Sequence, residues 1–300
     1  KIMDIGDNSG EIIEELGVKN EESSSLSKNN LKVLDINIDG LFKDYSKYKE
    51  TIELIKKISG KSLGELPVQE MHHLNEISEV FTGKKVKMLD EEEREGLLKV
   101  ISKIDLKLSD WINGRAFGVK QGVQKYGISI NSSEAELKKF ANDLTNAELR
   151  LCDFNEGKAK QLKDLKEELG SVEVARQIKQ GLGYRDVFEL TSLDIEKIKE
   201  LNKLSGGLEL KNTKGEIFEK MGVLLGEFNI VVRSTSLEDI KKLVTIVKLI
   251  SDKKAAGWFT SQAKEVLDCE MSDVKNEARS IKEKIQVLGF KKIMEISEQE

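Results

Sequence analysis

A single proline, Pro67, occurs in this chain of 300 residues. An average chain of that length would carry roughly 15 prolines, and a proline inside a helix removes a backbone hydrogen bond and clashes with the preceding turn. Helices can therefore run without interruption along most of the sequence. We expect helix wherever apolar residues recur at helical spacing.

Three segments show that spacing, in steps of three residues that keep the apolar side chains on one face of a helix. They are Val68, Met71, Leu74 and Ile77; Ile195, Ile198, Leu201 and Leu204; and Leu237, Ile240, Leu243 and Ile246. The sequence therefore predicts an all-α protein, predominantly helical, built from many short amphipathic helices.

Helix boundaries are marked as well. Starts are predicted where a Ser, Thr or Asp is followed three residues later by Glu, which is the capping-box pattern: Asp90–Glu93, Ser133–Glu136, Thr213–Glu216 and Thr235–Glu238. Ends are predicted where an apolar residue and a Ser or Thr precede a glycine: Gly60, Gly83 and Gly206. The Leu204–Ser205 and Ile250–Ser251 pairs stand 46 residues apart, as in two-helix repeats, but the other spacings share no period. An irregular bundle and a divergent helical-repeat arrangement both stay open.

A few short segments look extended. Residues 31–38 alternate at period two through Leu34, Ile36 and Ile38, which predicts a short strand. Residues 127–131, 208–210 and 228–232 are read as extended connectors or as strands of a small sheet.

The domain organisation is predicted from composition. Residues 19–30 are polar and rich in serine, so 1–30 is expected to be a flexible N-terminal segment. Residues 31–126 form a first helical subdomain, and 127–300 form a second, either separate from the first or continuous with it. Because the chain begins at Lys1 rather than at methionine, we expect a fragment or a processed product.

The charge balance narrows the choice of partner. The net charge is −5, with 49 basic and 54 acidic residues mixed along the chain, so we expect no nucleic-acid partner. No apolar run approaches the roughly 20 residues that span a bilayer, so no transmembrane segment is expected. The two cysteines, Cys152 and Cys269, lie far apart and are read as buried thiols. Because unpaired thiols persist in reducing environments, we expect the protein in the cytoplasm, or secreted into a reducing compartment such as a host cytosol.

No motif for catalysis, metal or cofactor binding is found. His72 and His73 are adjacent and would point about 100° apart on a helix, so they are read as surface or boundary residues and not as metal ligands. Gly60-Lys61-Ser62 lacks the first glycine of a phosphate-binding loop, and Gly181-Leu182-Gly183 lacks the third glycine of a dinucleotide loop. These two are interpreted as a helix end and as a turn between helices. The sequence assigns no catalytic residue, no metal and no cofactor.

The most unusual stretch is 111–127, where Gly114, Gly118 and Gly122 would form one bare face of a helix. In one interpretation, another helix of the same molecule packs on this face. In the other, the face is a partner-binding groove, bordered by Trp111, Arg115, Phe117 and Tyr126. Trp258 and Phe259 form a second candidate anchor for a partner.

The hypothesis that follows is a scaffold or binding module for another protein, since a helical scaffold needs only surfaces and grooves. A fragment of a larger, effector-like bacterial protein is one form of this hypothesis. The alternative is an enzyme or an enzyme regulator, of exchange-factor or transferase type, whose site is assembled from distant acidic and basic residues.

Overall fold

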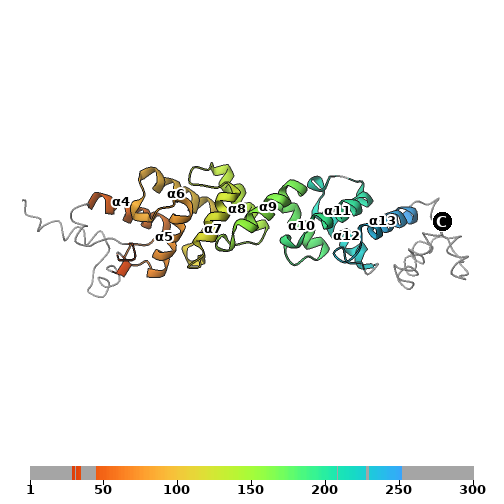
Figure 1. Cartoon of the computed structure of the whole chain (residues 1–300), viewed down its shortest axis with the longest axis horizontal. Helices are drawn as coiled ribbons and strands as arrows, with labels where there is room; N and C mark the ends of the chain where they lie inside the picture. Colours follow the sequence, from red (N-terminus) through yellow and green to blue (C-terminus); the bar gives the residue numbers. More distant parts are fainter. Residues whose placement is uncertain (1–28, 31, 35–44, 208, 228–229, 252–300) are drawn as a thin grey trace, which may run out of the picture. The chain divides into compact units, whose positions relative to one another are not determined.

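The computed structural model describes residues 29–30, 32–34, 45–207, 209–227 and 230–251. Within these residues it contains α-helices and short 3-10 helices and no strand (Figure 1), which confirms the all-α prediction. The α-helices are α4 (Tyr45–Ser59), α5 (Val68–Thr82), α6 (Glu91–Ile104), α7 (Ala116–Tyr126), α8 (Glu134–Asn146), α9 (Glu156–Leu169), α10 (Val172–Leu182), α11 (Ser192–Asn202), α12 (Gly215–Glu227) and α13 (Leu237–Ser251). The 3-10 helices are η1 (Val86–Met88), η2 (Leu108–Asp110), η3 (Leu151–Asp153), η4 (Val187–Glu189), η5 (Lys203–Ser205) and η6 (Leu210–Asn212).

The chain divides into two compact units, Lys1–Lys163 and Asp164–Glu300. The boundary falls within α9, whereas the boundary expected at residues 126/127 lies inside the first unit. Most of the segment expected to be flexible, residues 1–28, lies outside the described residues.

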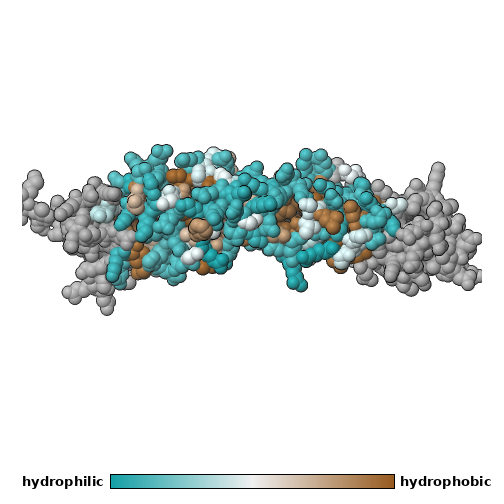
Figure 2. All heavy atoms as spheres, viewed as in Figure 1, coloured by the Kyte–Doolittle hydropathy of each residue, from teal (hydrophilic) through white to brown (hydrophobic). Residues whose placement is uncertain are grey.

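Each unit is a stack in which a helix packs on the next helix but one. In the first unit α4 packs on α6, α5 on α7, and α6 on α8; in the second, α10 packs on α12 and α11 on α13. Consecutive helices therefore belong to alternate layers, as they do in stacked helical repeats. Hydrophilic side chains cover much of the visible face and separate the apolar ones (Figure 2).

One connector recurs between these helices. It begins with a residue of left-handed backbone conformation and continues with two buried side chains three residues apart. In five copies the first buried side chain follows three residues after the left-handed residue: Gly60 with Leu63 and Leu66, Gly83 with Val86 and Leu89, Asp105 with Leu108 and Trp111, Glu148 with Leu151 and Phe154, and Gly207 with Leu210 and Thr213. A sixth copy, Gly183 with Val187 and Leu190, is one residue longer.

The same backbone hydrogen bond closes five of these connectors. The N–H of the second buried residue donates to the carbonyl of the first, at N···O distances of 3.0 to 3.3 Å, for Leu89, Trp111, Phe154, Leu190 and Thr213. The 3-10 turn thereby directs both side chains into the core before the next helix begins. This recurrence favours the helical-repeat arrangement over an irregular bundle within each unit.

The predicted helix boundaries are partly confirmed. Asp90 and Ser133 each make the full capping box, and Gly60, Gly83 and Gly206 have φ angles of 68°, 76° and 100°. The other two predicted boxes are wrong. The Thr213 hydroxyl accepts from Asn202 and donates to the carbonyl of Glu209, and the cap of α13 is Ser236, whose hydroxyl accepts from the Asp239 N–H at 3.0 Å. A box at Thr191 was missed because its third residue is Asp194, not Glu.

The expected strands are corrected where the structure describes them. Asn29, Asn30, Lys32 and Val33 are helical, and residues 127–131, 209–210 and 230–232 contain no strand. The Asn30 side-chain amide donates to the carbonyls of Leu63 and Leu66, at 2.6 and 2.8 Å. Those bonds hold this short helix against the first connector, which the period-two pattern did not reveal.

Candidate protein-binding surface

A short segment before α7 is fixed to α5 by one carboxylate. The Trp111 side chain is buried, and its indole N–H donates to Oε2 of Glu76 at 2.6 Å. The other carboxylate oxygen, Oε1, accepts the backbone N–H of Gly114 at 2.8 Å. Gly114 has a φ of 79°, which glycine adopts without strain. Because Glu76 holds both ends of residues 111–114, the start of α7 has a defined position.

The inner face of α7 packs closely on the segment that starts α9. Val119, Gly122 and Val123 are buried. A Cβ atom at Gly122 would lie 2.8 Å from the carbonyl carbon of Asn155 and 2.9 Å from the carbonyl oxygen of Phe154. Only glycine allows the two backbones to approach so closely. Gly122 is therefore a packing contact within the first unit.

The predicted bare face of three glycines is wrong. Gly114 precedes the helix, and neither Gly114 nor Gly118 is in close contact. A Cβ atom at Gly118 would only reach the Asn155 Cβ, at 4.0 Å. The three positions therefore do not form one groove, because the helix begins two residues after Gly114.

Tyr126 belongs to an aromatic cluster beneath α7. Its ring centroid lies 5.1 Å from that of Phe140 and 5.8 Å from that of Phe154. The phenol donates to Oδ2 of Asp143 at 2.5 Å. Burial, then this hydrogen bond, raise the pKa of Tyr126 far above its usual value, so the phenol stays protonated. The ring helps to hold α7 in place and does not border an open groove.

The outer face of α7 is different. Phe117 is 74% exposed, and Ile112 and Arg115, which precede it in the chain, are exposed as well. Phe117 lies on the opposite side of the helix from Val119 and Val123, because successive residues are rotated by about 100°. We call the exposed side chains of Phe117, Gln121 and Gln124, with the half-buried Lys120 next to them, the Phe117 surface.

The structure thus separates the residues predicted for partner binding. Arg115 and Phe117 are both exposed, on different sides of the start of α7, while Trp111 and Gly122 are buried. Trp258 and Phe259 lie outside the described residues. Glu76 was not predicted as a functional residue, because in the sequence it resembles any other glutamate of an amphipathic helix.

Comparison of the chain with models of protein families, with curated proteins and with solved structures finds no match.

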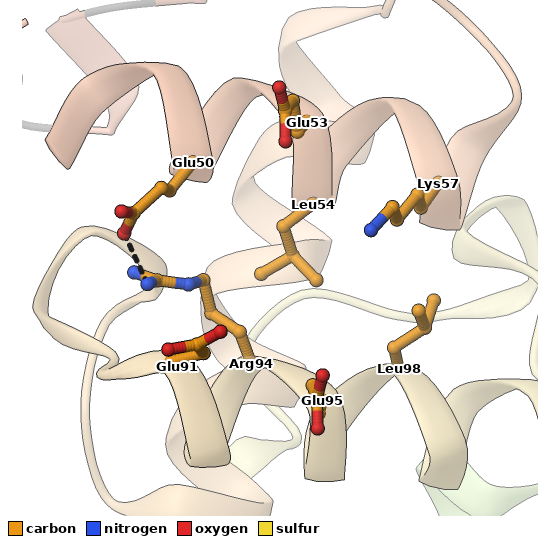
Figure 3. Close-up of a pocket in the computed structure, with 8 residues that line it drawn as sticks. All are labelled: Glu50, Glu53, Leu54, Lys57, Glu91, Arg94, Glu95 and Leu98. Carbon is orange, nitrogen blue, oxygen red and sulfur yellow. Dashed lines mark hydrogen bonds and ion pairs between the residues drawn. The ribbon is translucent and has the colours of Figure 1, made fainter. Parts of the chain in front are cut away.

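A second surface feature is a groove of about 190 Å³ between α4 and α6 (Figure 3). Leu54 and Leu98 form its apolar floor. Four glutamates and two basic residues surround the floor: Glu50, Glu53, Glu91, Glu95, Lys57 and Arg94. Arg94 is engaged within the protein, since it pairs with Glu50 and donates to the carbonyl of Leu89. The rim is acidic on balance.

A third feature is a hollow of about 180 Å³ lined in part by Cys152. The thiol is free and buried, and burial raises its pKa. Since the thiolate is the reactive form, we expect Cys152 to react with iodoacetamide at neutral pH roughly ten times more slowly, or slower still, than in the unfolded chain. Mass spectrometry of the peptide that contains Cys152, with and without denaturant, measures both rates. Equal rates would show that the thiol is accessible in the folded protein.

Among the described residues, no group of three or more His, Cys, Asp or Glu side chains is placed to hold a metal ion. None of the helices among these residues is both long and apolar enough to cross a bilayer. His72 is exposed, as expected, but His73 is buried, and its Nδ1–H donates to the carbonyl of Leu108 at 2.6 Å. His73 therefore stabilises a connector.

Proposed function

We propose that this chain is a scaffold that binds another protein through the Phe117 surface. The observation that carries the proposal is a large aromatic side chain, 74% exposed, at the start of a helix whose position is fixed by Glu76 and Gly122. Large aromatic side chains are enriched at the centres of protein interfaces, where they supply much of the binding energy. A fixed helix also limits the entropy lost on binding.

The stacked helices support the same proposal. Repeat-like stacks present continuous surfaces to partners, and each repeat contributes a helix to a layer. The alternative, an enzyme or an enzyme regulator, requires ionisable groups that converge in a pocket. The α4–α6 groove brings four glutamates together, but Lys57 and Arg94 lie among them. Such a mixture of acidic and basic side chains is typical of an ordinary charged helix surface.

Photo-cross-linking tests the proposal. A benzoylphenylalanine residue is placed at position 117 of the full chain, or at position 223 as a control, and the protein is irradiated in lysate of the source cells. Val223 on α12 is 65% exposed and apolar, and so is a matched position away from the Phe117 surface. We expect a discrete cross-linked partner at position 117 that is absent at position 223.

The partner identified in this way is then purified for binding measurements. We expect Phe117→Ala to weaken its affinity about tenfold or more, and Val223→Ala to leave the affinity unchanged. If positions 117 and 223 gave the same products, or if Phe117→Ala bound normally, this surface would not be the binding site.

A further inference from the structure

We propose that the Phe117 surface binds an acidic segment of the partner protein, one that presents carboxylates together with a large apolar side chain. This inference rests on the proposed function and specifies the chemistry of the partner. The chain as a whole is acidic, with 54 acidic and 49 basic residues, yet residues 111–133 contain no Asp or Glu. Their charged residues are all basic: Arg115, Lys120 and Lys125.

Two of these basic residues flank the face of α7 that carries Phe117. Residues 117, 121 and 124 lie at the centre of this face, at helical spacing. The half-buried Lys120 and the exposed Lys125 lie on either side of it, whereas Arg115, at the N-cap, is exposed about 200° around the helix from Phe117. Lys125 is 3.9 Å from Glu156, both are half-exposed, and such a pair contributes little.

Glu76, which lies beneath the start of α7, is already engaged. Both carboxylate oxygens of Glu76 accept hydrogen bonds, from Trp111 and Gly114. The N-terminal turn of α7 adds unsatisfied N–H groups and a partial positive charge beside Arg115 and Phe117. A carboxylate of the partner would therefore meet positive charge on this surface while an apolar side chain covers Phe117.

The same observations favour a protein segment over a nucleic acid or an anionic membrane. A polyphosphate partner requires many cations on one face, whereas this face of α7 has two, Lys120 and Lys125, separated by Gln121 and Gln124. An amphipathic helix carrying leucine or phenylalanine and Asp or Glu at spacings of three and four residues would match both the apolar centre and the basic flanks.

Selection from a library of displayed random peptides tests the inference. The full chain is the bait, and Phe117→Ala is used to remove peptides that bind elsewhere. We expect the Phe117-dependent peptides to be enriched in Asp and Glu and to contain a large apolar residue. An enriched peptide should bind Lys125→Glu roughly ten times more weakly than the parent chain, because like charges would then face each other. Circular dichroism checks that both variants are folded.

The outcomes separate this inference from the proposed function. Phe117-dependent peptides without an excess of acidic residues would overturn the acidic partner and leave the binding surface standing. A selection with no Phe117-dependent peptide would count against both. Sedimentation with phosphatidylserine vesicles, or a shift of single-stranded DNA, that is lost in Phe117→Ala would overturn the inference in favour of a membrane or a nucleic acid.

Discussion

Gly222→Ala in α12 is expected to lower the free energy of unfolding of the second unit by about 3 kcal/mol, the upper end of the usual cost of overpacking. Alanine favours a helix over glycine by about 1 kcal/mol, so helix propensity alone would predict the opposite sign. Packing decides the outcome, because a Cβ atom at position 222 would lie 2.0 Å from the carbonyl oxygen of Gly181 in α10. A backbone carbonyl cannot move aside as a flexible side chain can.

The contact is reciprocal. A Cβ atom at Gly181 would lie 2.5 Å from the carbonyl carbon of Phe218 and 2.8 Å from the backbone nitrogen of Glu219. The α10 and α12 backbones therefore meet at two glycines. The interpretation of Gly181-Leu182-Gly183 as a turn is wrong for Gly181, which lies inside α10; Gly183 is the left-handed residue that ends this helix.

Gly226→Ala is the matched control, since it lies in the same helix and has no neighbour within 4 Å. We expect this change to be neutral or to stabilise by up to about 1 kcal/mol. Hydrogen exchange in peptides from α10 and α12 measures both variants in the full chain. If Gly222→Ala were as stable as Gly226→Ala, the two helices would not pack at these glycines.

Lys197→Met is expected to lower the free energy of unfolding of the second unit by about 3–5 kcal/mol, because it breaks a buried ion pair. The Lys197 side chain is only 3% exposed. Its ammonium lies 3.5 Å from Oδ1 of Asp194 and donates to the carbonyls of Val232 and Arg233, at 2.9 and 3.5 Å. The variant leaves the Asp194 charge buried without this partner and removes the donor of the Val232 carbonyl.

Lys203→Met is the matched control. Lys203 also pairs with an acidic residue three positions earlier, Glu200 at 2.6 Å, but its side chain is 53% exposed. Exposed pairs of this kind contribute up to about 1 kcal/mol, so a small change is expected. Thermal and urea unfolding followed by hydrogen exchange compares the two variants. Equal losses would mean that Lys197 is not buried as the structure has it.

The connectors show what a pattern search can find. At Gly60 and Gly83 the left-handed residue is glycine, so the helix ends were predicted. At Asp105 and Glu148 other residues adopt the same conformation, with φ angles of 53°, so these copies were not recognised. Five of the six connectors have two apolar residues three positions apart, and the sixth has Leu210 and Thr213. These pairs do not recur at a fixed period in the sequence, because the helices between the connectors differ in length.

The sequence by itself determined the helical class, several helix ends and two capping boxes. These are local properties, set by backbone conformation, by hydrogen bonds within a few residues and by which face of a helix is apolar. Only the tertiary structure decided that Trp111 and Lys197 are buried and that Glu76 fixes the start of α7. It also decided that three glycines contact the backbone of another segment: Gly122, Gly181 and Gly222. Those facts depend on atoms brought together from distant parts of the chain, and residue type and spacing do not encode them directly.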